Sequence, residues 1–322
     1  MHILPFICLS IGILLGIFIK NKYFIIYSGK LSTIALSLLM LSIGLGIGID
    51  NSIMENFLKI GFNCIIISLS AIIFSVIFTI ICEKTVLPLK QLDEELEKKN
   101  ITFSTNNSVE KQEETTEVSD SDSKLVWIMP GSLIFGLLLG FLFQNNISSY
   151  FIDISFSIFL TILYICVGIS QGSDKDIFNY LKLLGIKIIW LSFAILIGSI
   201  TGGFIAGKLL NIPLNISVIS ASGMCYYSIT GAFMTNTYGL EVGTYGFIVN
   251  ILREVFTILL MPILIKISLG SPIAGGGAGN MDTMLMPVTK FVGARLGMVT
   301  LLTGTILTFI VPILLPLLAS LF

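Results

Sequence analysis

Long apolar runs, separated by short polar stretches, fill the first two thirds of the chain. A helix needs about 20 residues to cross the ~30 Å hydrocarbon core of a bilayer, and these runs have that length or nearly so. They cover residues 2–19, 31–49, 57–82, 125–143, 150–170 and 183–210. The pattern therefore predicts an all-α polytopic membrane protein.

Residues 211–322 follow a less regular pattern. Two further apolar runs, 242–267 and 296–318, are each preceded by a stretch of small and polar residues: "ISASGMCYYSITG" at 219–231 and "SPIAGGGAGNMDT" at 271–283. Such stretches are typical of broken helices in transporters. We expect about eight transmembrane helices plus two re-entrant or broken segments, and the alternative is ten spans in which both segments cross fully.

Three spans before residue 84 resemble three spans after residue 124. Four residues recur 124 positions later: Gly12, Gly16, Ser68 and Ser75 correspond to Gly136, Gly140, Ser192 and Ser199. A copy with an odd number of spans ends on the opposite side of the membrane, so the next copy is inverted. Inverted repeats are typical of secondary transporters.

The segment 84–124 has a different composition. It holds ten of the 19 acidic residues of the chain, together with six Lys. Low hydrophobicity and mixed charge predict a largely disordered cytoplasmic linker, with a regulatory or partner-binding role as the alternative. The expected organisation is a first repeat at 1–83, this acidic linker, a second repeat at 125–210, and a transport core of two broken units at 211–322.

Basic residues set the expected orientation. With the N-terminus outside, most Lys residues of the connecting loops fall on the cytoplasmic side, as the positive-inside rule requires. Lys266 lies on the cytoplasmic side only if the stretch 211–240 is re-entrant, and it lies outside if that stretch crosses the membrane. The distribution favours eight spans, with both termini outside.

Composition excludes several classes of protein. The chain of 322 residues is 55% hydrophobic and only 11% charged, and its net charge of −1 suggests no nucleic-acid partner. His2 is the only histidine, and there is no P-loop motif, so neither a histidine-based metal centre nor P-loop nucleotide hydrolysis is expected. The five cysteines lie in or beside apolar runs, as small buried hydrophobes do. We expect a transporter with no cofactor, embedded in the lipid bilayer, and not an enzyme; a homodimer remains open.

Ionisable residues within apolar runs are functional candidates because they are costly to insert. Glu254 is the deepest, with Arg253 beside it and Asn250 one turn earlier; the alternative is a structural ion pair with another helix. Asp50 ends the run "LSIGLGIGIDNS" (41–52), and its counterpart in the second copy is Ser173. Asp50 is either an interfacial helix end or part of a polar site that the preceding glycines keep open.

The broken segments supply the other candidates. Backbone that is not helical survives at membrane depth where it lines a cavity or is buried in protein. Its free N–H groups attract a carboxylate, and its carbonyls attract a cation. The polar residues expected there are Ser222, Gly223, Tyr227, Ser228, Asn280 and Asp282.

Four motifs, "GIGIDN", "ASGMCYYSITG", "ILREVFTILLMP" and "GNMDTMLMP", resemble the LysO family of bacterial lysine exporters. The resemblance is strongest over 219–318 and leaves out the linker. It implies export of L-lysine, driven by a proton or sodium gradient, and two important intramembrane acids that map onto Asp50 and Glu254.

A mechanism follows from that resemblance. One acid would hold an ammonium group of lysine, while helix ends and Arg253 meet its carboxylate. A proton arriving at Asp50 or Glu254 would neutralise the acid and release the cation, which is proton antiport. The alternatives are a Na⁺-coupled carrier of another organic solute and an intramembrane enzyme with paired carboxylates.

Overall fold

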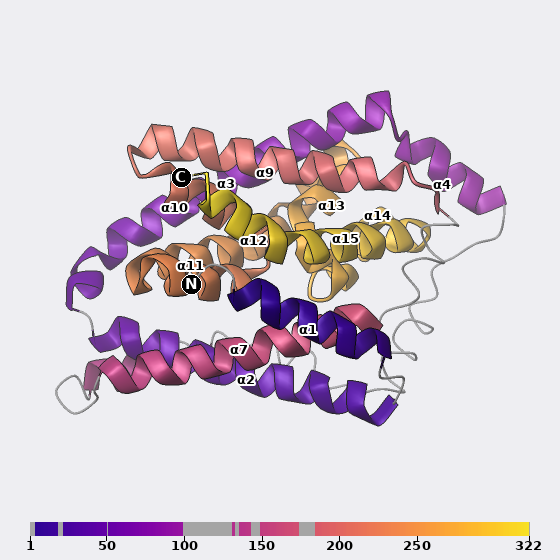
Figure 1. The fold of residues 1–322 in the computed structure, drawn as a ribbon. Helices are drawn as coiled ribbons and strands as arrows, with labels where there is room; N and C mark the ends of the chain where they lie inside the picture. Colours follow the sequence, from indigo (N-terminus) through magenta and orange to yellow (C-terminus); the bar gives the residue numbers. More distant parts are fainter. Residues whose placement is uncertain are drawn as a thin grey trace. The chain divides into compact units, whose positions relative to one another are not determined.

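The computed structural model describes residues 4–18, 22–49, 51–98, 131–132, 135–142, 149–173 and 184–321. Every regular element among them is a helix, which confirms the all-α prediction (Figure 1). The chain divides into two compact units. Unit 1 holds Met1–Lys59, Ser108–Lys175 and Thr235–Gly243, and unit 2 holds Ile60–Asn107, Asp176–Met234 and Thr244–Phe322.

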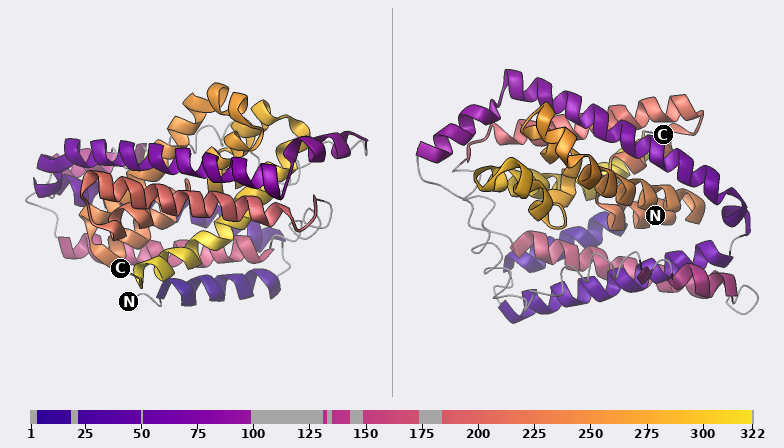
Figure 2. Two further views of the ribbon diagram at one scale, coloured as in Figure 1. Left: turned by 90° about the horizontal axis from the view of Figure 1, so that it is seen from above. Right: turned by 180° about the vertical axis from the view of Figure 1, so that it is seen from behind.

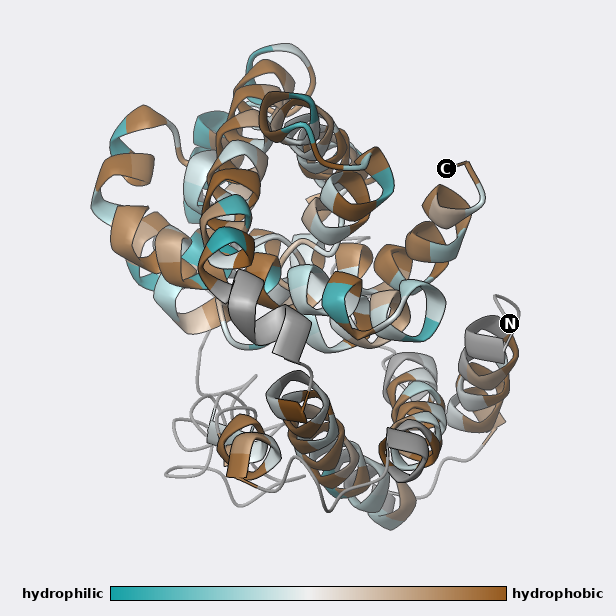
Figure 3. Ribbon diagram, turned by 90° about the vertical axis from the view of Figure 1, so that its left-hand side faces the viewer, coloured by the Kyte–Doolittle hydropathy of each residue, from teal (hydrophilic) through white to brown (hydrophobic). Residues whose placement is uncertain are grey.

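Five of the described helices are long and apolar enough to cross a membrane. The candidate spans are Tyr27–Gly46, Leu58–Thr85, Ile188–Leu210, Leu240–Ile267 and Ala294–Ala319. Hydrophobic residues are distributed along the lengths of the helices (Figure 3). A multi-pass membrane protein is therefore the class that the structure supports.

Unit 1 is built on helices packed through glycines. It contains α1 (Leu4–Phe18), α2 (Lys22–Ile49), the helical stretch 135–142 and α7 (Ser149–Ser173). Both α1 and α2 pack on α7 (Figure 1). A Cβ atom on Gly12 or Gly16 would overlap a backbone carbonyl of α7. Small residues let helix backbones approach this closely, so these glycines are packing positions.

The glycine contacts in unit 1 occur in corresponding pairs. Gly12 meets Ile165, and Gly136 meets Leu41; Gly16 meets Ile169 and Gly172, and Gly140 meets Leu45 and Gly48. In each pair of contacts, both residues of one contact correspond to the residues of the other at an offset of 124 positions: Gly12 corresponds to Gly136, and Leu41 corresponds to Ile165. The first helix of each copy therefore packs on the second helix of the other copy, within the part of the chain that the structure describes.

In unit 2, α3 and α9 lie side by side and run in opposite directions (Figures 1 and 2). The helix α3 (Asn51–Thr85) enters this unit at Ile60, and α9 spans Ile188–Leu210. The hydroxyl oxygens of Ser75 and Ser199 are 3.0 Å apart, and Ser70 Oγ donates to the carbonyl of Gly202 at 2.8 Å. Ser75 and Ser199 are corresponding residues of the two copies, so the third helices meet at equivalent positions.

The helix breaks where the small, polar stretches occur in the sequence. The first broken segment consists of α10 (Leu214–Ala221) and α11 (Tyr227–Tyr238), and the long helix α12 (Leu240–Ile267) follows it. The second consists of α13 (Gly270–Gly276), the 3₁₀ turn η1 (Gly277–Met281) and α14 (Leu285–Val292), followed by α15 (Ala294–Ala319).

The apolar runs locate the long helices, but α2 begins at Lys22 rather than at residue 31, α3 begins at Asn51 rather than at residue 57, and α9 begins at Ile188 rather than at residue 183. Most of the predicted span 125–143 lies outside the described residues. All five cysteines are buried free thiols, as their apolar surroundings suggest.

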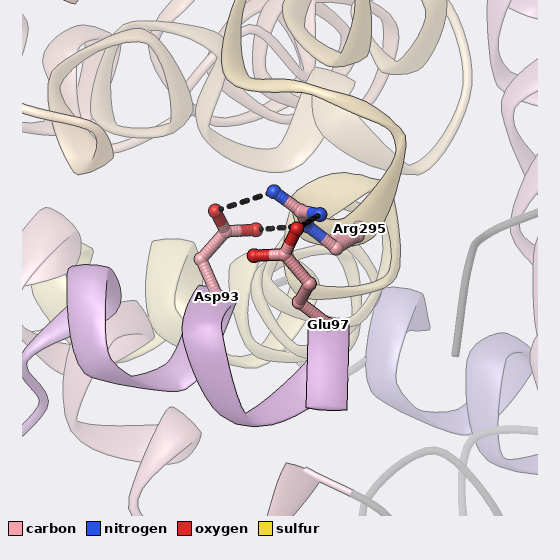
Figure 4. A network of polar contacts seen from close by, with 3 residues as sticks. All are labelled: Asp93, Glu97 and Arg295. Atoms are coloured by element: carbon pink, nitrogen blue, oxygen red, sulfur yellow. Dashed lines mark hydrogen bonds and ion pairs between the residues drawn. The ribbon is translucent and has the colours of Figure 1, made fainter. Parts of the chain in front are cut away.

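The first part of the predicted disordered linker is helical. The helix α3 continues to Thr85, and residues Leu89–Lys98 form the amphipathic helix α4, whose Leu89 and Leu96 are buried. Arg295, at the start of α15, holds α4 through ion pairs with Asp93 at 2.8 Å and Glu97 at 3.1 Å (Figure 4). The rest of the predicted linker, 99–124, lies outside the described residues.

Candidate functional site

The two helix breaks cross each other in unit 2. The carbonyl of Met224, in the first break, accepts the N–H of Ala278, in the second, at 2.8 Å. Met224 and Cys225 are buried and have positive φ angles of 49° and 73°, and Gly277 has a φ of 54°. Positive φ in residues other than glycine is unfavourable and persists only where surrounding contacts fix it. The crossing is therefore a constrained backbone structure.

Asn250 of α12 holds the first break. Its side chain is fully buried. Its Oδ1 accepts the N–H of Cys225 at 2.9 Å, and its Nδ2 donates to the carbonyls of Ser220 at 2.9 Å and Gly246 at 2.7 Å. Buried backbone groups need such partners in place of water. Asn250 thus supplies hydrogen bonds that the broken helix has lost.

Arg253, one turn further along α12, holds the second break. It is also fully buried. It donates to the carbonyls of Ala274 at 2.9 Å and Gly275 at 3.2 Å, and to the hydroxyls of Ser199 at 2.7 Å and Ser75 at 3.2 Å. The guanidinium group therefore joins α3, α9 and α13 to α12.

Two acidic side chains come together beside the crossing. Glu254 lies close enough to Asp282 for the two carboxyl groups to interact, and within hydrogen-bonding reach of the side chain of Thr283. The hydroxyl of Tyr227 lies within electrostatic reach of both acids. Glu254 is half-buried and Asp282 is exposed, so this acidic group can be reached from outside unit 2. Two acids and a hydroxyl can together bind an ammonium group or protons.

The remaining predicted residues of the first break line the crossing in different ways. Ser222 is buried and donates to the carbonyl of Val218 at 2.7 Å, within its own helix. A Cβ atom on Gly223 would lie 2.7 Å from Asn250 Oδ1, so only glycine fits there. Ser228 is buried, and the ring of Tyr227 packs edge-on against Phe247 at 5.6 Å. Of these residues, Tyr227 is the one placed near the acids.

Asn280 occupies the 3₁₀ turn of the second break and is fully buried. Its Nδ2 donates to the carbonyl of Ile273 at 2.7 Å. Its Oδ1 has no hydrogen-bond partner among the described residues. The carbonyl of Ile273 also accepts the N–H of Gly277, so Asn280 adds a second hydrogen bond near the end of α13.

Asp50 lies outside the described residues, so its relation to Glu254 stays a prediction. The glycines before it are described. Gly48 packs against the backbone of Leu137, Gly140 and Phe141, and Gly46 packs against the side chain of Leu240. At Gly48 the absence of a side chain thus lets another helix backbone approach, as expected of these glycines, and their role in the approach of a substrate stays a prediction.

Several contacts that build the site were not predicted. The sequence marks Ser75 and Ser199 only as corresponding positions of the two copies, but in the structure both hydroxyls accept hydrogen bonds from Arg253. The sequence predicts no role for Glu83, but its carboxylate accepts the N–H of Gly270 and the hydroxyl of Ser268, both at 2.8 Å, at the start of α13. Two features of the sequence indicate these residues: Ser75 and Ser199 occupy corresponding positions in the two copies, and Glu83 is an acid at the end of an apolar run.

Comparisons with known proteins agree with this architecture. The family described as "Lysine exporter LysO" matches residues 6–92 and 131–319. The "Lysine exporter LysO" of Escherichia coli (strain K12) is 31% identical over 124 residues, which are 38% of this chain and 42% of that protein. The match thus spans less than half the length of this relative.

The match with a second relative covers more of that protein's length. The "Putative lysine exporter" of Haemophilus influenzae (strain ATCC 51907 / DSM 11121 / KW20 / Rd) is 24% identical over 189 residues, which are 57% of this chain and 93% of that protein. No solved structure matches the chain. The family is one of transporters and not of enzymes. Because the family match covers most of the sequence, the chain belongs to the lysine exporter LysO family.

Proposed function

We propose that this protein exports L-lysine across the bacterial cytoplasmic membrane. The observation that carries the proposal is the acidic group formed by Glu254 and Asp282 at the crossing of two broken helices. An acidic site set among apolar helices favours a cationic solute. Membership of the lysine exporter family and the names of both relatives support lysine as that solute.

The proposed topology has eight spans and two re-entrant broken segments, with both termini outside. Two copies of three helices would form inverted repeats. The contacts that recur at an offset of 124 residues support this, as does the antiparallel pairing of α3 with α9 through Ser75 and Ser199. Equivalent helices of inverted repeats must run in opposite directions, and these two do.

For recognition, we propose that an ammonium group of lysine binds between Glu254 and Asp282, with the hydroxyl of Tyr227 as a further polar contact. The carboxylate of lysine would bind at the N-terminal end of α11. A helix N-terminus carries partial positive charge and unpaired N–H donors, which suit a carboxylate.

For coupling, we propose antiport with protons. A proton that neutralises Glu254 removes the charge that holds the ammonium, so proton entry and lysine release compete for one group. Asp50 would be a second acid on the exit path. The proposed energy source is an ion gradient, with no cofactor.

The test is lysine efflux from loaded proteoliposomes, with pH and Na⁺ gradients imposed separately. We expect efflux to follow the pH gradient, and Glu254→Gln and Asp50→Asn to lower the coupled rate at least tenfold. Glu241→Gln is the matched control, because Glu241 is an exposed acid on the same helix as Glu254.

Two outcomes would count against the proposal. Wild-type rates in both acid variants would exclude the coupling scheme. Efflux that follows the Na⁺ gradient alone would favour a Na⁺-coupled carrier.

A further inference from the structure

Arg253 is a buried cation, and each of its three side-chain nitrogens donates to a protein acceptor. Its Nε and Nη atoms make four hydrogen bonds, two to hydroxyls and two to carbonyls. Among the described residues, no carboxylate lies within ion-pair distance of it. A group that binds the carboxylate of a transported solute must present free donors to the solute's path, and the fully buried guanidinium of Arg253 does not.

The two carbonyls are those that the helix break leaves without their usual partners. In an uninterrupted α-helix, the carbonyl of Ala274 would accept the N–H of Ala278, four residues later. That N–H instead donates to the carbonyl of Met224 at 2.8 Å. Arg253 Nη2 donates to Ala274 at 2.9 Å, and Nε donates to the adjacent carbonyl of Gly275 at 3.2 Å. Arg253 thus replaces hydrogen bonding that the crossing of the breaks has diverted.

The positive charge of Arg253 also lies beside the partial negative charge at the C-terminal end of α13. Ala274 and Gly275 lie in the last turn of α13, and the C-terminal end of a helix carries partial negative charge. Ser75 and Ser199 fix the other side of the guanidinium from α3 and α9. Arg253 therefore ties the end of α13 to α3 and α9 as well as to its own helix, α12.

Arg253 and Glu254 are consecutive on α12, and consecutive helical side chains point about 100° apart. The side chain of Arg253 holds the end of α13, and the carboxyl group of Glu254 is within electrostatic range of Asp282, which follows η1 directly after α13. We propose that Arg253 is a positioning residue: it fixes the end of α13 and thereby holds Asp282 near Glu254, and it does not bind lysine.

The experiment compares lysine with its methyl ester, which keeps both ammonium groups and lacks the carboxylate charge. Lysine transport by reconstituted protein gives KM and Vmax, and competition by the ester gives its inhibition constant. The inference rests on the proposed lysine transport for its readout. If the wild-type protein transports no lysine, the proposed function is wrong. If the wild-type protein transports lysine but the variants of Arg253, Ser75 and Ser199 do not behave as stated below, the inference is wrong.

For Arg253→Lys, we expect KM for lysine and the inhibition constant of the ester to rise by the same factor, roughly tenfold, since hydrogen bonds to a charged group are lost. One ammonium group cannot reach carbonyls and hydroxyls on three helices. Unchanged transport in this variant would show that the charge alone is needed and would overturn the inference. A loss of affinity for lysine with no change for the ester would show that Arg253 binds the carboxylate, which would also overturn it.

The double variant Ser75→Ala, Ser199→Ala tests the same role without altering the charge. We expect both constants to rise together again, by a smaller factor than for Arg253→Lys. Ser68→Ala is the matched control, because Ser68 is a buried serine of α3 whose hydroxyl donates to Ile65 in its own helix. If Arg253→Lys fails to insert, the double variant decides: no difference from Ser68→Ala would overturn the inference.

Discussion

Met224 and Ala278 are joined by a backbone hydrogen bond of 2.8 Å that links the two broken helices of unit 2. Neither residue carries a functional side chain. Because the N–H of Ala278 donates to Met224, it does not donate to the carbonyl of Ala274, its usual helical partner. That carbonyl accepts a hydrogen bond from Arg253 instead. The crossing is thus maintained by backbone groups, and α12 supplies the side chains that complete their hydrogen bonding.

A methyl group at Gly277 should disrupt this crossing. In Gly277→Ala the new Cβ would lie 2.8 Å from the carbonyl of Met224, at a φ of +54° that disfavours L residues. We expect destabilisation of about 1–3 kcal/mol from the backbone strain alone, and loss of lysine transport. Thermal unfolding in detergent measures the first effect. Gly293→Ala is the control, because its φ of +93° is also strained but its Cβ would meet no atom within 4 Å. Equal stability of the two variants would show that the contact with Met224 is unimportant.

Asn250→Ala should uncouple the first break from α12. The substitution leaves the N–H of Cys225 and the carbonyl of Ser220 without a side-chain partner in a buried site. Each unsatisfied buried group costs about 1–3 kcal/mol, so we expect a loss of several kcal/mol in the free energy of unfolding. Denaturant titration of purified protein measures it. Asn215→Ala is the comparison, since Asn215 is half-buried and bonds only to the neighbouring N–H of Ile216; a similar loss there would contradict the prediction.

The paired glycine contacts of unit 1 predict matched effects of substitution. Gly12→Ala and Gly136→Ala each place a methyl group against a helix carbonyl, of Ile165 and Leu41 respectively. Overpacking of this kind costs typically about 1–3 kcal/mol, and we expect similar losses for the two variants. The unfolding midpoints in detergent would show this. Gly29→Ala should be neutral, because its Cβ would meet no atom within 4 Å. A large loss in only one of the two variants would argue against equivalent packing of the copies.

The contact between Arg295 and α4 should be modest and salt-dependent. Arg295 bonds both carboxylate oxygens of Asp93, at 2.8 and 3.1 Å, but the side chains are 33% and 26% exposed. Exposed ion pairs contribute about 0–1 kcal/mol and weaken as salt screens them. We expect Arg295→Met to increase proteolytic cleavage after Lys90 at low salt and to differ less from wild type at high salt. Arg295→Lys should give an intermediate result, and protection in Arg295→Met equal to wild type would show that the buried leucines alone hold α4.

The sequence by itself determined the helical class, the positions of the long helices and the two places where a helix breaks. Apolar runs of membrane length allow little except helices, because backbone polar groups must be satisfied within each segment. It also showed the correspondence of Gly12 with Gly136 and of Ser75 with Ser199. It did not predict α4, because the average composition of 84–124 conceals the local spacing of Leu89, Leu92 and Leu96.

Only the tertiary structure decided which polar groups meet. The sequence offered Arg253 as a ligand for lysine; the fold surrounds it with Ser75, Ser199 and the end of α13. The sequence likewise singled out Glu254, but its neighbour Asp282 is set by the path of the second break. Helical periodicity fixes the direction of a side chain relative to its own helix. The partner it meets depends on how distant helices cross, which no local pattern encodes.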